Sequence, residues 1–255
     1  QLNLSTEDAK LLEDLYESFK ANGATLNKDD KEKYRKLSMD LSMLTLQFDQ
    51  NALKDKNRFE LLITDENELS GLPESARDAA AMLAKSKDKN GWLFNLSAPS
   101  YIPFMRYSDK RDLREKMYRE YMSVGNKGDE FDNKDIIKKI VNIRLEIAQL
   151  MGFKNYAEYA LEHTMAKNSA NVYKLLNQLL EAYKPIAINE YNAVEGFALG
   201  TEKENITVMP WDWSYYSEKL RDIRFKVNDE MTRPYFELSN VKKGVFGLAT
   251  QLYGI

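Results

Sequence analysis

The sequence predicts a mainly α-helical protein: a multi-helix domain with long antiparallel helices and a small two-stranded β element. Three observations lead to this fold class. Apolar residues recur every three or four positions over most of the 255 residues, which is the period of an amphipathic helix. Residues that cap helices precede many of these stretches. Two short apolar runs lack the helical period and have the length of strands.

The first two helices have clear boundaries. Ser5 and Thr6 can cap the first helix, and Asn22-Gly23 ends it, because glycine readily adopts the left-handed backbone that closes a helix. Asn27 can cap a longer second helix. The apolar faces are Ala9, Leu12, Leu15, Tyr16 and Phe19 in the first helix, and Tyr34, Leu37, Leu41, Leu44 and Phe48 in the second. Since the connection is short, we expect an antiparallel hairpin.

A small β element is expected next. The apolar runs 59–63 and 92–96 are flanked by polar residues and are predicted to pair as strands, with a helix over 74–86 between them. Residues 98–103 are predicted to be extended, because a residue that precedes proline avoids the helical region. Ser108 can then cap a helix that runs to Val124.

The polar stretch 126–133 is the best candidate for an internal linker. It predicts a division into 1–125, a helical hairpin plus the small β element, and 126–255, a helical region. In the second region we expect helices at 134–152, 155–163, 169–200, 214–225 and 240–253. Asn155 and Ser169 are the expected caps of two of them, and Pro185 is expected to kink the longest.

Composition excludes several classes of protein. The net charge is −3, and acidic and basic residues are mixed along the chain without a basic stripe, so nucleic acid is not an expected partner. No apolar run approaches the roughly 18 residues that a membrane-spanning helix needs, so no membrane partner is expected. The chain has no cysteine and therefore no disulfide. We expect a cytoplasmic protein, or a periplasmic one if a signal peptide has been removed.

The sequence offers no catalytic or metal-ligating residue. A catalytic zinc usually takes three protein ligands, and His163 is the only histidine. Glu162 and Glu158 are near it in sequence, but adjacent residues of a helix face different directions. His163 is therefore expected at a helix end on the surface. No G-x-S-x-G, P-loop or G-x-G-x-x-G motif occurs, so no nucleophile or phosphate site is predicted.

An aromatic stretch at 210–216 is the candidate binding site, and two interpretations stand side by side. In the first, Asp212, Tyr215 and Tyr216 are substrate-binding residues of a cleft wall, where a tyrosine hydroxyl can donate to a peptide carbonyl. In the second, the aromatic residues pack around a helix start that is capped by Ser214.

Several motifs, in order along nearly the whole chain, carry a family resemblance. They include Glu68-Leu69-Ser70-Gly71-Leu72-Pro73, Asp112-Leu113-Arg114-Glu115, Gly152-Phe153-Lys154-Asn155-Tyr156 and Pro210-Trp211-Asp212-Trp213-Ser214-Tyr215-Tyr216. In this set the chain resembles the zinc peptidases of the thimet oligopeptidase, oligopeptidase A and dipeptidyl carboxypeptidase family. The particular residues within these motifs are most similar to those of the bacterial dipeptidyl carboxypeptidase (peptidyl-dipeptidase) branch.

The resemblance implies a nearly all-α zinc peptidase with a deep channel, whose H-E-x-x-H zinc motif lies further toward the C-terminus than Ile255. We therefore expect the chain to begin and end within a longer protein. It would be the inactive, non-catalytic helical portion, forming one wall of the substrate channel. The full-length enzyme would hold zinc in a C-terminal catalytic domain and remove C-terminal dipeptides from short peptides. The alternative is a stand-alone helical interaction module without enzymatic activity.

Overall fold

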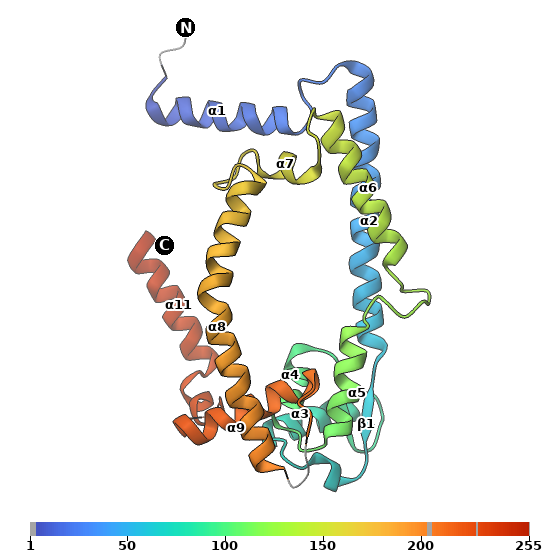
Figure 1. Ribbon diagram of the computed structural model, residues 1–255, viewed down its shortest axis with the longest axis vertical. Coiled ribbons are helices and arrows are strands. Elements are labelled where there is room, and N and C mark those ends of the chain that lie inside the picture. The colour runs from blue at the N-terminus through green and yellow to red at the C-terminus, as the bar shows by residue number, and fades with distance from the viewer. Residues whose placement is uncertain (1–3, 203–205, 228, 255) are drawn as a thin grey trace. The chain divides into compact units, whose positions relative to one another are not determined.

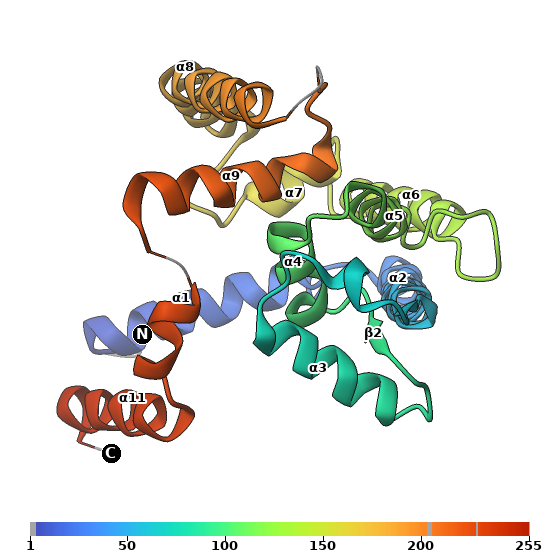
Figure 2. The same cartoon turned by 90° about the horizontal axis from the view of Figure 1, so that it is seen from below.

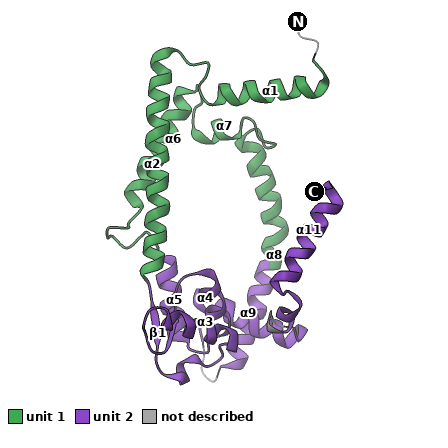
Figure 3. Cartoon of the chain, turned by 180° about the vertical axis from the view of Figure 1, so that it is seen from behind, with its two compact units in different colours: residues 1–58, 123–186 green, residues 59–122, 187–255 purple. Residues whose placement is uncertain are grey.

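The computed structural model describes residues 4–202, 206–227 and 229–254, and helices dominate it (Figure 1). The chain divides into two compact units (Figure 3). Unit 1 comprises Gln1–Arg58 and Ser123–Ile186, and unit 2 comprises Phe59–Met122 and Ala187–Ile255. The expected mainly α fold with a small two-stranded sheet is confirmed. The expected boundary between residues 125 and 126 stays a prediction, because packing does not test which segment folds alone.

In unit 1 the long helix α2 (Lys28–Arg58) packs along α6 (Lys134–Leu150), which runs in the opposite direction (Figure 1). Long antiparallel helices are therefore confirmed, but the partner of α2 is not the expected first helix. That helix, α1 (Thr6–Ala21), points away from α2 and leaves its apolar face exposed. Its C-terminal end is held by α7 (Tyr156–Leu161), because the Tyr159 hydroxyl donates to the Ala21 carbonyl.

Side-chain caps begin most helices of unit 1 where they were expected. Ser5, Asn27 and Asn155 each accept a hydrogen bond from the backbone N–H three residues later. The long helix α8 (Ser169–Thr201) begins at Ser169, but Asn168 rather than Ser169 supplies its cap. The helix continues through Pro185 as one element, and the division between the units falls just after this proline.

A buried carboxylate holds the polar stretch 126–133 against the end of α2. Asp55 is fully buried and accepts hydrogen bonds from the Gly125 N–H at 2.7 Å, from Arg58 at 2.7 Å and from Lys127 at 3.2 Å. Asn133 adds a bond to the Phe48 carbonyl. The expected linker is therefore a non-helical loop whose ends are fixed inside unit 1.

Unit 2 contains the predicted β element. Strand β1 (Leu61–Ile63) pairs antiparallel with β2 (Trp92–Phe94), and Leu62 lies opposite Leu93. A short 3-10 helix, η1 (Glu66–Leu69), and α3 (Glu74–Lys85) connect the strands, and α3 packs on β2. Gly71 precedes α3 at φ +84°, and a Cβ atom there would lie 2.1 Å from the Tyr107 carbonyl oxygen. Only glycine fits this turn.

The expected extended conformation of 98–103 is wrong: these residues begin α4 (Ala98–Tyr107). Pro99 lies in the first turn, where a missing N–H costs no helical hydrogen bond. Pro103 does remove one, but the next residue, Phe104, is fully buried and packs edge-on against Phe94 at 4.8 Å between ring centroids. Burial of an aromatic side chain thus outweighs the local preference of the residues before proline.

Helix α5 (Arg111–Met122) begins two residues later than a cap at Ser108 would place it, because Ser108 ends α4 and does not cap α5. Likewise α9 (Pro210–Phe225) begins at Pro210, not at Ser214. Helix α9 packs beside α4 and α5 (Figure 2). The chain continues through α10 (Asp229–Thr232), η2 (Arg233–Tyr235) and α11 (Leu238–Tyr253).

Candidate functional site

Asp212 lies within the aromatic stretch 210–216 and is fully buried in unit 2. It lies in the first turn of α9, where its carboxylate accepts the Met209 N–H at 3.0 Å. This contact, and not a cap by Ser214, secures the helix start. Two arginines of α5 complete the shell: Arg111 donates to both carboxylate oxygens at 2.8–3.1 Å, and Arg114 donates to Oδ1 at 2.9 Å.

Arg114 is the buried base of this cluster, with 1% of its side chain exposed. Besides Asp212 it donates to the Ser108 carbonyl at 2.7 Å and to the Trp211 carbonyl at 3.3 Å. Its guanidinium lies 4.0 Å from the centroid of the Tyr215 ring. The buried ion is therefore held by three hydrogen bonds and one aromatic ring, and the Arg114–Asp212 pair ties α5 to α9.

Tyr215 is 6% exposed, and its hydroxyl donates to Asp109 at 2.7 Å. Asp109 also accepts from Ser70 at 2.6 Å and from Lys219 at 3.3 Å. Lys219 lies over the Tyr215 ring at 4.4 Å. The hydroxyl of Tyr215 is thus held in one direction by a carboxylate that is itself fixed by two further donors.

Tyr216 of α9 is 2% exposed and belongs to a buried cluster with residues of α8. Its hydroxyl donates to Glu202 at 2.6 Å, and its ring meets Phe197 and Tyr215 edge-on. Val194 and Ala198 of α8 pack against the same ring. The residue fastens the C-terminal part of α8 to α9.

The electrostatics of the cluster favour a charged Asp212 and neutral tyrosines. Burial pushes the pKa of Asp212 upward, but hydrogen bonds from Arg111, Met209 and Arg114 outweigh it and leave the pKa below its ordinary value. Burial, followed by the hydrogen bond to a carboxylate, raises the pKa of Tyr215 and of Tyr216. Both hydroxyls therefore act as hydrogen-bond donors near neutral pH.

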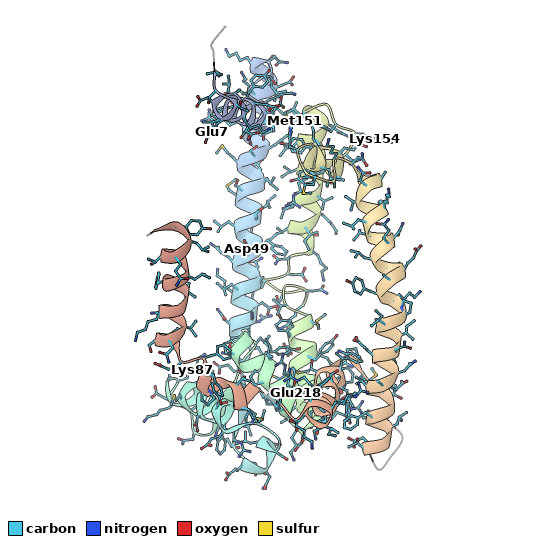
Figure 4. All side chains as sticks on the ribbon, turned by 90° about the vertical axis from the view of Figure 1, so that its left-hand side faces the viewer. Glu7, Asp49, Lys87, Met151, Lys154 and Glu218 are labelled. Atoms are coloured by element: carbon cyan, nitrogen blue, oxygen red, sulfur yellow. The ribbon has the colours of Figure 1, made fainter. Side chains whose placement is uncertain are left out.

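A pocket of about 370 Å³ borders this cluster in unit 2. Its lining residues are Gly71, Arg106, Tyr107, Asp109, Glu218, Lys219 and Asp222. Charges of both signs face it, and Glu218, labelled in Figure 4, accepts a hydrogen bond from the Tyr107 hydroxyl at 3.2 Å. Because Asp109 also lines the pocket, Tyr215 is one hydrogen bond away from it.

The three residues expected to bind substrate thus lie together in unit 2, and the hydrogen bonds described above for Asp212, Tyr215 and Tyr216 are made inside that unit. This packing agrees with part of the second interpretation, although its Ser214 cap is wrong. Substrate binding stays a prediction. Sequence reasoning missed Arg111 and Arg114; the one available signal was their place in a helix whose motif resembles that of a peptidase family.

Zinc does not fit the residues that the structure describes. Among them there is no group of three His, Cys, Asp or Glu side chains that could hold a metal ion. His163 lies just after α7 with about half of its side chain exposed, and its Nε2 is 3.4 Å from Glu162 and 3.8 Å from Glu17. Among the described helices, none combines the length and the apolar character that spanning a membrane requires.

Sequence comparison places these helices in a known group. The pattern of Peptidase family M3 matches residues 104–255. Oligopeptidase A of Salmonella typhimurium is 36% identical over 259 residues, which is 99% of this chain and 38% of that protein. The probable cytosolic oligopeptidase A of Arabidopsis thaliana is 37% identical over 263 residues, covering 99% of this chain and 37% of the relative.

The dipeptidyl carboxypeptidase of Escherichia coli is 31% identical over 256 residues, which is all of this chain and 37% of that enzyme. The chain therefore spans less than two fifths of the length of these relatives. The pattern match covers more than half of the chain, and the relatives align along its whole length. This chain belongs to Peptidase family M3.

Proposed function

We propose that this chain is the non-catalytic helical portion of a zinc-dependent oligopeptidase, in which it forms one wall of the substrate channel. The longer peptidase is called the parent below. One observation carries the proposal: the relatives align with 99% or more of this chain, whereas the chain accounts for only 37–38% of each relative. The chain then corresponds to one part of a peptidase, and the remaining length is available for a catalytic domain.

In this proposal zinc is a cofactor of the parent and not of residues 1–255. A bound zinc ion supplies an activated water for hydrolysis of the peptide bond. The described residues do not provide its ligands, so we assign the zinc and its chemistry to the C-terminal catalytic domain, which is the proposed partner of this chain. Short peptides are the proposed substrates, and a cytoplasmic location is proposed from the name of the Arabidopsis thaliana relative.

Asp212, Tyr215 and Tyr216 remain the proposed substrate-side residues of the wall. The pocket beside Asp109 supports a role for Tyr215, because its hydroxyl fixes a carboxylate that faces open space. Asp212 is enclosed by Arg111 and Arg114 and would act by holding α9 in place. Tyr216 would act in the same way through Glu202.

Two product patterns are proposed, each with its own support. The residues within the motifs, which resemble those of the dipeptidyl carboxypeptidase branch, favour release of C-terminal dipeptides from short peptides. Identities of 36–37% to the oligopeptidases A, against 31% to the dipeptidyl carboxypeptidase, favour cleavage within oligopeptides. Mass spectrometry of digests of N-terminally blocked peptides by the parent separates the two, because only the first pattern shortens every peptide by two residues at a time.

The same experiment tests the proposed function itself. A parent that cleaves blocked peptides and loses this activity to a chelator agrees with the proposal. A parent that cleaves none of them, although it is folded and supplied with zinc, would support the alternative of a helical interaction module without enzymatic activity.

A further inference from the structure

Helix α8 carries one wide apolar side along most of its length. At 100° per residue, six large apolar side chains between positions 175 and 186 fall on the same side as Val194 and Ala198 near the C-terminal end of the helix. These side chains are Leu175, Leu176, Leu179, Leu180, Tyr183 and Ile186. Lys174 and Glu181 lie on the opposite side and Lys184 lies at its edge, so this part of the helix is amphipathic.

The two ends of this apolar side differ in what covers them. At the C-terminal end, Val194 and Ala198 are buried against Tyr215 and Tyr216 of α9. Toward the N-terminal end the same side is open: Leu180, for example, is 58% exposed. Figure 4 shows the side chains of α8 standing out from the helix. The apolar side chains from Leu175 to Ile186 are called the open face below.

The open face is larger than the scattered apolar residues of an ordinary surface. Single exposed leucines are normal, but contiguous apolar patches mark interaction sites. All six side chains of the open face are at least 41% exposed, and no charged residue lies among them on that side of 175–186. Covering them contributes roughly 25 cal/mol for each Å² of apolar surface removed from water. The open face therefore has the character of an interaction surface.

We propose that the open face is the docking surface for an apolar segment of the parent that lies outside this chain, a proposal that rests on the proposed function. Two facts favour this occupant. The relatives hold more than 60% of their length outside the aligned region, so such polypeptide exists in proteins of this kind. The open face also lies within the stretch matched by the M3 pattern. Because the face lacks charge, the occupant presents aliphatic or aromatic side chains, in the way α9 does at the other end.

Thiol labelling tests the proposal, since residues 1–255 contain no cysteine. Leu176→Cys places a thiol on the open face, and the matched control Gln178→Cys places one two residues away, on the opposite side of the helix. Both positions are exposed in this chain. Each variant is made in the parent and in residues 1–255, and the rate of modification of the introduced thiol is followed by mass spectrometry.

In the parent we expect Leu176→Cys to react at least about tenfold more slowly than Gln178→Cys, because labelling then requires local opening. In residues 1–255 the two rates should be similar. Equal rates in the parent would overturn the proposal. Protection of Leu176→Cys in residues 1–255 that grows with protein concentration would also overturn it, in favour of a second copy as the occupant.

The labelling result is independent of activity. A parent that protects Leu176→Cys but cleaves no peptide would keep the docking surface and refute the proposed function. A parent that cleaves peptides but leaves Leu176→Cys as reactive as Gln178→Cys would do the reverse. A Leu176→Cys parent with an unchanged thermal midpoint shows that the labelling reports on the native fold.

Discussion

Each unit is organised around one fully buried aspartate, Asp55 in unit 1 and Asp212 in unit 2. The two sites share a plan. Each carboxylate accepts one backbone N–H and two basic side chains, and each ties together segments that are far apart in the sequence. The bases differ. Arg58 and Lys127 around Asp55 are 37% and 21% exposed, whereas Asp212 has one exposed base, Arg111 at 45%, and one buried base, Arg114 at 1%.

The difference decides what each ion pair contributes. Partly exposed bases can turn toward water when their partner is lost, so the pairs of Asp55 are worth little beyond the hydrogen bond to Gly125. Arg114 is buried and cannot turn toward water, so removing its carboxylate partner leaves an unpaired charge in the interior. The site of unit 2 is therefore rigid, and that of unit 1 is adaptable.

The largest effect is expected for Asp212→Ala. The substitution leaves the buried Arg114 without its carboxylate partner and removes the acceptor of the Met209 N–H. The free energy of unfolding should therefore fall by about 3–5 kcal/mol. Urea denaturation followed by circular dichroism measures the change. The control is Asp222→Ala, an exposed aspartate of the same helix, which should be nearly neutral. Equal stability of the two variants would contradict the account of unit 2.

A smaller loss is expected for Asp55→Ala. Arg58 and Lys127 regain water, and the main cost is the unsatisfied N–H of Gly125, worth about 1–3 kcal/mol. Asp49→Ala, at an exposed position of the same helix, is the matched control. If Asp55→Ala destabilises as strongly as Asp212→Ala, the contrast between the two sites is wrong.

Acid should remove the contribution of Asp212 gradually. Its folded pKa lies below the unfolded value, so its stabilisation is present above about pH 4 and is lost as the pH falls toward the folded pKa. The difference in stability between the wild-type chain and Asp212→Asn should therefore be constant near neutral pH and shrink below about pH 4. Denaturation series at several pH values measure it. A difference that stays constant down to pH 3 would show that the carboxylate charge is not what stabilises this site.

The smallest effects on stability are expected for Tyr215→Phe and Tyr216→Phe, which each remove only a hydroxyl that donates to Asp109 or Glu202. Loss of that hydrogen bond should lower the free energy of unfolding by about 0.5–1.5 kcal/mol. In the parent, kcat/KM should fall by more than this loss of stability explains if the hydroxyls orient groups on the substrate side. Tyr173→Phe, on the exposed part of α8, is the control. Unchanged kcat/KM in both variants would leave these residues with a packing role alone.

Local chemistry explains which parts of the fold could be predicted. Helix starts at Ser5, Asn27 and Asn155 follow from side chains that satisfy N–H groups three residues away, and the sequence displays them. The start of α4 could not be predicted, because burial of Phe104 against Phe94 outweighs a local rule and depends on tertiary packing.

Contacts between residues that are far apart in the sequence were the main feature that could not be predicted. The apolar period of α1 reveals which side of the helix avoids water, but not that Tyr159 would hold its end away from α2. Arg114 lies 98 positions from Asp212, and although each residue lies in a motif of the family resemblance, neither motif indicates that the two side chains pair. The aromatic stretch at 210–216 could be singled out by composition, whereas the carboxylates that orient its hydroxyls could not.

The central claim is that residues 1–255 are a non-catalytic part of a zinc peptidase, and one paired measurement tests it most directly. Metal content and cleavage of blocked peptides are measured for the parent and for residues 1–255, with circular dichroism as the check of folding. We predict tightly bound zinc and chelator-sensitive cleavage in the parent, and neither in folded residues 1–255. Stoichiometric zinc with chelator-sensitive cleavage by residues 1–255 alone, or a folded parent with neither property, would contradict the account.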